Sequence, residues 1–445
     1  MYALYSTLLA LALLVTLPYW IFQMLRHDKY RRGLNERLGR IPARLRADPR
    51  PGIWIHAVSV GEVLAISGVV ERLRSDYPDH RVAISTITDA SQRLARKRFG
   101  EENVFFFPLD FKFAIRPYLQ FLRPALIVIA ETEFWPNFLR LAHQMGAPIA
   151  VVNARISDRS LPGYRRFSRI FKRILNQIDI FLTQTSEDAR RLLEIGAPAE
   201  HVRVIGNLKF DVPLPPATPL VTDLRSAFAK ASAGPVFVCG SSVQDEEPLL
   251  LRAFQNVLAS YPQSMMILAP RHPERFAEVA RLLQDLHTRF WRRSTWNGEP
   301  MAGGVLLLDS IGELTSLYAL ADVAFVGGSL VPRGGHNIIE PAQHGVAIVV
   351  GNHTENFRDI VELFASRDAV KIVGPAELPL VFMELIKSDA NGHENSERIS
   401  LGRRAAQTAR DQMGATERTM TELSRLLSVS KRSGPLPAES AAHTG

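Results

Sequence analysis

Two series of short apolar runs, separated by a proline-rich break, constrain the fold of this chain more than any other feature. From Gly52 onward, the runs alternate with longer stretches of helical periodicity, which is the pattern of parallel sheets with crossover helices. The run at 126–130 is apolar at every position, as expected for a strand that is buried on both faces. The alternation therefore predicts an α/β protein with doubly wound sheets.

The break divides the predicted strands into two groups. The strands cover residues 53–57, 82–85, 104–107, 126–130, 149–152, 181–184 and 202–205 before it, and 236–239, 265–269, 305–308, 323–326 and 347–350 after it. Residues 213–219 contain four prolines, which exclude the interior of a helix or sheet. We predict Rossmann-like domains at 52–210 and 235–428, a linker at 211–234, and a disordered tail at 429–445. In such sheets ligands bind beyond the carboxyl ends of the strands, so a cleft between the domains is the expected site of chemistry.

The first 25 residues carry no charged side chain. Residues 2–22 are apolar and, at helical rise, long enough to cross a hydrocarbon core of about 30 Å. Bulky residues close this run, which disfavours a cleaved signal peptide. We predict a signal-anchor helix at 1–25, which either crosses the membrane or, because Pro18 permits a kink, enters one leaflet.

Basic residues concentrate directly after the anchor. Residues 26–50 hold nine Lys or Arg against three acids, so this stretch contributes +6 of the net charge of +8. We predict a basic juxtamembrane segment at 26–51 that retains the remaining chain in the cytoplasm and contacts anionic lipids. No nucleic-acid motif is recognisable. The single cysteine, Cys239, excludes an intrachain disulfide framework.

A glycine-rich segment at 327–340 is the strongest candidate for ligand binding. It follows a predicted strand, contains Gly327, Gly328, Gly334 and Gly335, and leads into a helix expected to begin near Asn337. Such a loop lets backbone N–H groups approach an anion, so a phosphate is the expected guest. Glu340, one turn into the helix, could accept hydrogen bonds from ribose hydroxyls. Neither a dinucleotide fingerprint nor a P-loop is present.

Two further segments of the second domain could complete a nucleotide site. Arg271 follows the strand at 265–269 and could pair with a phosphate, although a surface ion pair is an alternative. Residues 310–314 could present backbone groups to a base or ribose, but spacing alone does not decide this. We predict no metal site, because His336, His344 and His353 lack the spacing of helical metal ligands.

Carboxylates follow two strands of the first domain. Glu62 falls in the first turn of a helix predicted at 62–76, where it could remove a proton from a hydroxyl group. Position alone favours a simpler role, the stabilisation of the helix dipole. Glu131 and Glu133 follow the most buried strand. Lys209 precedes the linker, where a cation could neutralise a leaving group, and Arg155 could bind an anion or form an ion pair.

Taken together, these segments resemble the 3-deoxy-D-manno-octulosonic acid (Kdo) transferases of Gram-negative lipopolysaccharide assembly. The resemblance extends from the anchor to about residue 427 and rests on seven motifs in the same order. They are His-Ala-Val-Ser-Val-Gly-Glu at 56–62, Glu-Thr-Glu-Phe-Trp-Pro-Asn at 131–137, Asn-Ala-Arg at 153–155, Leu-Lys-Phe-Asp at 208–211, Pro-Arg-His-Pro-Glu-Arg-Phe at 270–276, Gly-Glu-Leu at 312–314 and the segment 327–340.

The resemblance implies an inverting, metal-independent glycosyltransferase of the GT-B type without a cofactor. It would transfer Kdo from CMP-Kdo to the tetraacylated lipid A precursor, lipid IVA, at the cytoplasmic face of the inner membrane. It also implies that Glu62 is the proton acceptor, and that Glu131 and Lys209 stabilise the transition state. CMP would bind at Pro270, Arg271, Ile311, Gly312, Glu313, Asn337, Ile338, Ile339 and Glu340.

The last motif departs from the family at one point. The usual Asn-Pro-Leu-Glu is here Asn337-Ile338-Ile339-Glu340, and proline in a first helical turn is favourable but dispensable. Two other functions remain open from the sequence. One is a transferase or epimerase that uses a different nucleotide sugar, and the other is a membrane-tethered protein that only senses a nucleotide.

Overall fold

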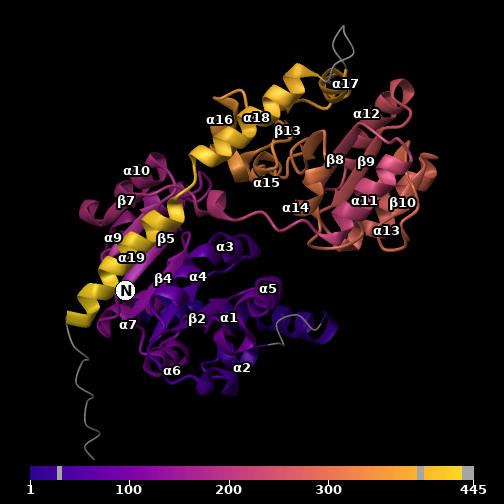
Figure 1. Cartoon of the computed structure of the whole chain (residues 1–445). Helices are drawn as coiled ribbons and strands as arrows, with labels where there is room; N and C mark the ends of the chain where they lie inside the picture. Colours follow the sequence, from indigo (N-terminus) through magenta and orange to yellow (C-terminus); the bar gives the residue numbers. More distant parts are fainter. Residues whose placement is uncertain (28–32, 388–394, 433–445) are drawn as a thin grey trace, which may run out of the picture. The chain divides into compact units, whose positions relative to one another are not determined.

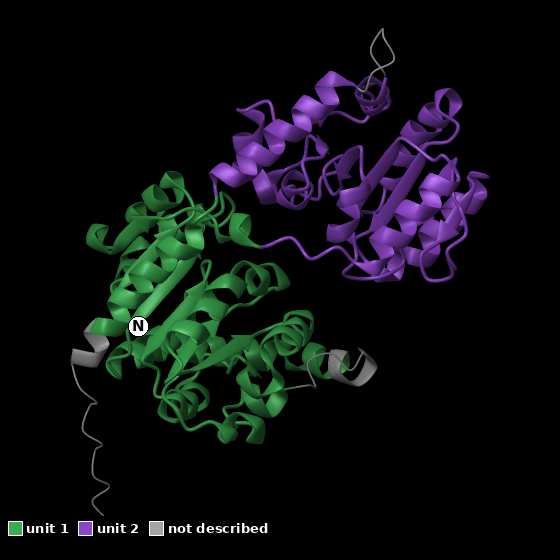
Figure 2. Ribbon diagram, in the orientation of Figure 1, with its two compact units in different colours: residues 1–212, 413–445 green, residues 213–412 purple. Residues whose placement is uncertain are grey.

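The computed structural model describes residues 1–27, 33–387 and 395–432 of the 445-residue chain. Residues 28–32 of the predicted basic segment and residues 433–445 of the predicted tail lie outside the described residues. The chain divides into two compact units (Figure 2). The first contains residues 1–212 together with the segment from Met413 onward, and the second contains residues 213–412.

The first unit is built on a seven-stranded parallel sheet of order β3-β2-β1-β4-β5-β6-β7. The strands are β1 (Gly52–His56), β2 (Arg81–Thr86), β3 (Val104–Phe106), β4 (Leu126–Ala130), β5 (Ile149–Ala154), β6 (Ile180–Thr183) and β7 (Val202–Val204). All residues of β1, β4 and β5 are buried, which for β4 confirms the expectation drawn from its continuous apolar run. The carboxyl ends of β1 and β4 lie side by side, since Trp54 pairs with Ile127.

Helices cover both faces of this sheet (Figure 1). The helices α6, α7 and α9 contribute to the core on one face, and α3, α4, α5 and α19 contribute to the core on the other. The helices of this unit are α1 (Tyr2–His27), α2 (Leu34–Arg37), α3 (Val60–Ala65), α4 (Ser67–Asp76), α5 (Asp89–Phe99), α6 (Lys112–Leu122), α7 (Pro136–Gln144), α8 (Leu161–Arg166), α9 (Ser168–Leu175), α10 (Ser186–Glu194) and α19 (Ala415–Arg432).

The second unit repeats the architecture, with a parallel sheet of order β10-β11-β9-β8-β12-β13-β14. Its strands are β8 (Val236–Ser242), β9 (Met265–Pro270), β10 (Phe290–Arg292), β11 (Gly304–Leu307), β12 (Val323–Val326), β13 (Ala347–Gly351) and β14 (Lys371–Val373). Every strand predicted from the sequence is therefore present. The sequence analysis missed β10 and β14, because these three-residue edge strands contain charged residues and lack an apolar run.

The helices of the second unit include two very short ones near the predicted nucleotide segments. Its helices are α11 (Pro219–Lys230), α12 (Glu247–Ser260), α13 (Phe276–Asp285), α14 (Leu314–Leu317), α15 (Ile339–Gln343), α16 (Arg358–Ala365), α17 (Leu378–Ile386) and α18 (Ser396–Asp411). Short 3₁₀ helices occur in both units: η1 (Ala43–Ala47), η2 (Glu101–Asn103), η3 (Ala199–His201), η4 (Leu208–Asp211), η5 (Pro273–Arg275), η6 (Tyr318–Leu320) and η7 (Glu355–Phe357).

Two predicted domain boundaries are wrong. The linker does not extend to residue 234, because α11 begins at Pro219 and buries Leu220, Leu224 and Phe228 in the core of the second unit. Proline suits the first turn of this helix, since its fixed φ matches helical geometry. The second domain does not extend to residue 428, because α19 buries Met420 and Leu423 in the core of the first unit.

Part of the predicted juxtamembrane segment also belongs to the folded first unit. The Glu36 carboxylate accepts a hydrogen bond from the Phe106 backbone N–H at 2.8 Å and pairs with Arg44 at 2.7 Å. Leu45 is fully buried in the core. The part of this segment that contains Glu36, Arg44 and Leu45 therefore packs against the first unit.

Candidate active site

Glu62 lies at the carboxyl end of β1 and closes a capping box at the start of α3. The Ser59 hydroxyl accepts a hydrogen bond from the Glu62 backbone N–H, and the Glu62 carboxylate accepts one from Ser59 N–H, each at 3.2 Å. The carboxylate also accepts the Val58 N–H at 2.7 Å. The predicted continuous helix at 62–76 is instead divided into α3 and α4. Position favoured a role in stabilising the helix dipole, and the structure adds a capping box that holds the carboxylate in one orientation.

The surroundings of Glu62 make its carboxylate an unusually good proton acceptor. The residue is only 7% exposed. Burial raises the pKa of its carboxyl group to about 7, with the negative charges of Glu131 and Glu133 acting in the same direction. A group with this pKa exchanges protons near neutral pH, which is the property required of a general base. The capping role and the catalytic role are thus compatible in one side chain.

Glu131 and Lys209 are brought together although they are 78 residues apart in the chain. The Lys209 ammonium donates to the Glu131 carboxylate at 3.2 Å. Glu131 has a φ of 56° and directly follows β4, so the chain turns sharply there. Non-glycine residues rarely adopt this conformation, and it is common at functional sites. Glu131 is also close enough for its charge to act on Glu62. The predicted catalytic residues Glu62, Glu131 and Lys209 therefore lie together beyond the carboxyl ends of β1 and β4.

Side-chain amides hold Lys209 in place. The Asn153 side chain accepts the Leu208 backbone N–H, and the Asn207 side chain accepts the Lys209 backbone N–H, each at 3.0 Å. Asn153 is the penultimate residue of β5 and has a φ of 54°, close to that of Glu131. The motif containing Asn153 thus acts through η4, which carries Lys209.

Glu133 and Arg155 lie in the loops that follow β4 and β5, at the same end of the sheet. Burial and the charge of Glu131 raise the pKa of the Glu133 carboxyl group. The Thr132 hydroxyl donates to the backbone carbonyl of Arg155. The loop after β4 is therefore attached to the loop after β5.

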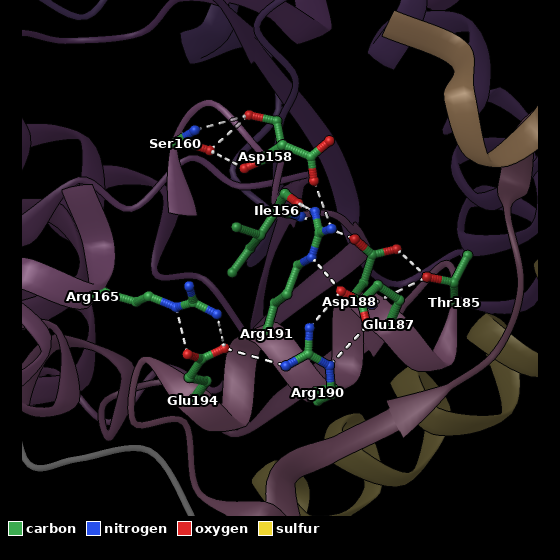
Figure 3. Close-up of polar contacts among 11 residues, drawn as sticks. Ile156, Asp158, Ser160, Arg165, Thr185, Glu187, Asp188, Arg190, Arg191 and Glu194 are labelled. Carbon is green, nitrogen blue, oxygen red and sulfur yellow. Dashed lines mark hydrogen bonds and ion pairs between the residues drawn. The ribbon is translucent and has the colours of Figure 1, made fainter. Parts of the chain in front are cut away.

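An ion-pair network on α10 fixes the loop after β5 (Figure 3). The Arg191 guanidinium donates to the Ile156 carbonyl and pairs with Asp158, each at 2.6 Å. The Asp188 carboxylate accepts the Ile156 N–H at 3.1 Å. The exposed side chains Arg165, Glu187, Arg190 and Glu194 extend this network across the surface. The sequence analysis missed it, since charges at helical spacing are normally solvated.

In the second unit, a buried glutamate from the loop after β8 binds backbone N–H groups at the start of the glycine-rich loop. Glu246 accepts the N–H groups of Gly328, Ser329 and Leu330 at 2.7, 3.1 and 2.9 Å. It also accepts Val243 N–H at 3.3 Å and is 0% exposed. The expectation that a phosphate uses these loop amides is wrong for these three groups, because the buried carboxyl group of Glu246 already accepts their hydrogen bonds. A phosphate would have to use other groups of the loop.

The neighbouring Glu247 stabilises the loop that carries Arg271. Its fully buried side chain pairs with Arg275 at 3.1 Å. The Arg271 backbone N–H donates to the Ser242 carbonyl at the end of β8 at 2.8 Å. The sequence showed two consecutive glutamates after a strand, but acids in a first helical turn are usually ordinary dipole partners. Their burial became evident only in the structure.

Arg271 lies near the glycine-rich loop. Burial, followed by the positive charges of Arg271 and His272, lowers the pKa of His336 to about 4, so this imidazole is neutral at physiological pH. The exposed Arg271 guanidinium and the neutral imidazole provide N–H donors that an anion could use.

The segments around residues 313 and 340 also meet. The Glu340 carboxylate accepts hydrogen bonds from the Thr315 hydroxyl at 2.7 Å and from the Asn337 amide at 3.2 Å. The helix α15 begins at Ile339 rather than near Asn337 and has only five residues. Thr315 was not identified from the sequence, since no spacing rule connects it with Glu340.

The remaining predicted nucleotide residues differ in what they can offer a ligand. Ile338 and Ile339 are buried, so only their backbone groups could contact one. Gly312 has a φ of 89° and open space where a Cβ would lie. Glu313 pairs with Arg293 at 3.0 Å. Within residues 1–27, 33–387 and 395–432, no group of three or more His, Cys, Asp or Glu side chains is placed to hold a metal ion.

Known proteins resemble this chain over most of its length. The sequence model of the family described as 3-deoxy-D-manno-octulosonic-acid transferase (kdotransferase) matches residues 32–212. A 3-deoxy-D-manno-octulosonic acid transferase of Haemophilus influenzae is 32% identical over 94% of this chain and 96% of its own length. The corresponding protein of Bordetella pertussis is 35% identical over 87% of this chain and 90% of its own.

Solved structures identify the fold. A putative UDP-N-acetylglucosamine 2-epimerase from Listeria monocytogenes superposes with a TM-score of 0.57 at 12% identity, covering 87% of this chain and 98% of that chain. At this identity the likeness concerns the fold alone. Together with the two parallel seven-stranded sheets, it shows a GT-B fold.

Proposed function

Because the chain belongs to the family of 3-deoxy-D-manno-octulosonic acid (Kdo) transferases, we propose that it transfers Kdo from CMP-Kdo to the tetraacylated lipid A precursor, lipid IVA. The proposed reaction inverts the anomeric centre in a single displacement and uses no metal ion. The observation that carries the proposal is the placement of a carboxyl group with a pKa of about 7, Glu62, beside the Glu131–Lys209 pair.

In the proposed mechanism, Glu62 removes the proton from a sugar hydroxyl of the acceptor as that oxygen attacks the anomeric carbon of Kdo. The new C–O bond forms while the bond to the CMP phosphate breaks, and CMP leaves with the bonding electrons. The N–H groups of Val58 and Ser59 keep the Glu62 carboxylate oriented for this transfer. A pKa of about 7 leaves a large fraction of this group ionised at neutral pH.

Lys209 and Glu131 have complementary roles in this proposal. The Lys209 ammonium stabilises negative charge that develops in the transition state. Glu131 holds the ammonium in position through the 3.2 Å contact. Its charge also raises the pKa of Glu62, so Glu131 contributes to the basicity of the proposed catalytic carboxylate.

The second unit supplies the donor site in this proposal. Arg271, which follows Pro270, pairs with the phosphate of CMP, as guanidinium groups commonly do. Glu340 accepts hydrogen bonds from the ribose hydroxyls, with Asn337 and Thr315 fixing its orientation. Residues 311–313 and the backbone of 338–339 complete the contacts with the nucleotide.

The proposed location is the cytoplasmic face of the inner membrane, where α1 attaches the enzyme to the bilayer. The segment Tyr2–Phe22 of α1 is long and apolar enough to interact with the hydrocarbon core. Anionic lipids are the expected partners of the basic residues near this helix. A lipid-linked acceptor would then encounter the enzyme by diffusion in the membrane plane.

The test replaces Glu62, and a substitution of the nearby Glu133 serves as the control. Glu62→Gln should lower the rate of Kdo transfer by about 10²–10⁴-fold, because the amide cannot accept the proton, while CMP binding stays unchanged. Glu133→Gln is the control and should retain most of the transfer rate. Mass spectrometry of the lipid product and measurement of CMP release give the readout. Transfer at the normal rate by the Glu62 variant would exclude Glu62 as the base, and release of a different nucleotide from a panel of donors would exclude CMP-Kdo.

A further inference from the structure

The first two turns of α1 are attached to the folded first unit by polar contacts. The Ser6 hydroxyl accepts a hydrogen bond from the Asn137 amide at 3.0 Å. The Tyr5 hydroxyl donates to the Asp110 carboxylate. The Tyr2 ring lies 4.7 Å from the Arg140 guanidinium. An additional hydrogen bond joins the Tyr2 hydroxyl to the Gln177 side chain.

The partners of α1 are part of the fold rather than mobile surface groups. Asp110 and Asn137 are almost completely buried. The Asp110 carboxylate accepts the N–H groups of Asn137 at 3.0 Å and Phe138 at 2.8 Å, and so satisfies the free donors at the start of α7. Since α7 directly follows the loop that carries Glu131, the start of α1 lies near the catalytic loop. These contacts can form only if Tyr2–Ser6 lie on the same side of the membrane as the catalytic residues.

The segment that follows α1 also packs in the first unit, from α2 onward. Beyond residues 28–32, the Arg37 guanidinium lies 4.5 Å from the Phe106 ring, and the Arg37 carbonyl accepts the Leu109 N–H at 2.8 Å. The 26 residues of α1 span about 39 Å at helical rise. A helix that crossed a hydrocarbon core of about 30 Å would place Tyr2–Ser6 on the far side of the membrane. Crossing is therefore incompatible with the contacts of its first two turns.

Over residues 2–15, α1 has two faces that differ in exposure. Tyr2, Ser6, Leu9 and Leu13 recur at helical spacing and are partly covered. Leu4, Leu8, Leu11 and Val15 also recur at helical spacing and are exposed. An exposed apolar stripe of this length requires an apolar partner. Because the first two turns of α1 are attached to the folded unit, the stripe suits the acyl region of one leaflet.

A pocket beside the start of α1 has the chemistry of a headgroup region. It has a volume of about 520 Å³ and is lined by Ser6, Phe111, Lys112, Phe113, Arg116, Pro117 and Gln120. Lys112 and Arg116 are exposed, and Phe113 is 60% exposed. Exposed aromatic and basic side chains are typical of the bilayer interface, where the cations meet anionic lipid headgroups.

We propose that α1 is a monotopic anchor that lies along the cytoplasmic leaflet of an anionic bilayer, with both ends on the side of the catalytic unit. The stripe through Leu4, Leu8, Leu11 and Val15 enters the acyl region, and Lys112 and Arg116 contact headgroups. This inference rests on the proposed membrane location and not on the proposed reaction. It decides between the two modes of attachment that the sequence left open, and it places the catalytic loop at the depth of the lipid headgroups.

Cysteine accessibility in membranes containing the full chain tests this topology. In a Cys239→Ser background, Ala3→Cys reports on the start of α1 and Ser260→Cys on the second unit, because both positions are exposed. A membrane-impermeant maleimide should label both variants in inverted vesicles and neither in spheroplasts. Labelling of Ala3→Cys in spheroplasts would show a crossing helix and overturn the proposal.

A cross-link decides the case in which lipid shields Ala3→Cys from both sides. Ser6→Cys combined with Asn137→Cys should form a disulfide on mild oxidation in membranes, since the two side chains are in contact. Leu11→Cys with Asn137→Cys is the control and should not cross-link. Thermal unfolding of the reduced proteins as in the parent protein shows that they are folded, and a folded Ser6→Cys/Asn137→Cys variant that does not cross-link overturns the proposal. Neither measurement depends on transfer activity, so the topology can fail independently of the proposed function.

Discussion

Glu62 in the first unit and Glu246 in the second are both buried, and both accept backbone N–H groups after a parallel strand. Glu246 accepts four such groups, three of them from a different loop. Glu62 accepts two from its own turn and lies near the charges of Glu131 and Glu133. A carboxylate has about four acceptor positions, so Glu246 is saturated, whereas Glu62 can still accept a proton. The comparison separates a structural carboxylate from the one that we propose to be catalytic.

The largest expected effect tests the structural member of this comparison. Glu246→Gln should lower the free energy of unfolding by about 3 kcal/mol, because the amide N–H₂ would face backbone donors and leave them unsatisfied. Donor KM should rise with it, since the loop at 328–330 loses its support. Thermal unfolding and donor kinetics measure these changes. Asp245→Asn, at an exposed position of the same turn, should change neither, and an unchanged stability of Glu246→Gln would contradict the structural role.

The second prediction concerns the pH dependence of stability at Glu62. Its pKa rises from 4.5 to about 7 on folding, so the native state disfavours the ionised form and loses stability as pH rises through this range. Glu62→Gln removes this loss. Relative to wild type, the variant should therefore gain about 3 kcal/mol in unfolding free energy between about pH 4 and pH 8. Denaturant unfolding at both pH values measures the difference, and a constant difference between the two proteins would argue against the raised pKa.

A smaller effect should appear in the pH profile of transfer. The kcat of the wild type should increase with pH through an apparent pKa of about 7, because Glu62 must be ionised. Glu131→Gln removes the larger of the two charges that raise this pKa and should move the rising limb to lower pH. Glu133→Gln should move it less, since its charge contributes less. Equal shifts in the two variants, or none, would exclude the proposed coupling.

The smallest expected effects concern the surface ion pairs of α10, whose carboxylates are more exposed than Glu62 and Glu246. Arg190→Ala should leave the unfolding free energy nearly unchanged, because its ion pairs are exposed and screened by solvent. Arg191→Ala should cost more, since this guanidinium also holds the Ile156 carbonyl. Unfolding in denaturant measures both variants. A larger loss in the Arg190 variant would show that the surface network, rather than the loop contact, provides the stabilisation.

The sequence predicted the two sheets well and the site in part. Apolar runs such as 126–130 identify buried strands directly, because a strand enclosed on both faces contains little else. The motifs identified the grouping of Glu62, Glu131 and Lys209 through a family resemblance. The environment of each side chain was not predictable, since Glu246 and Gly328 are 82 residues apart and no pattern connects them. The contact between Tyr5 and Asp110 could not be predicted from the sequence for the same reason.

The sequence by itself determined the α/β architecture, the apolar character of the first helix and the family, because these properties depend on local composition and on the order of motifs. The tertiary structure decided which carboxylate is saturated and which can accept a proton, and to which unit α19 belongs. Burial and hydrogen bonding depend on groups that approach only after folding. A local pattern therefore identifies candidate residues, and the packed surroundings determine their chemistry.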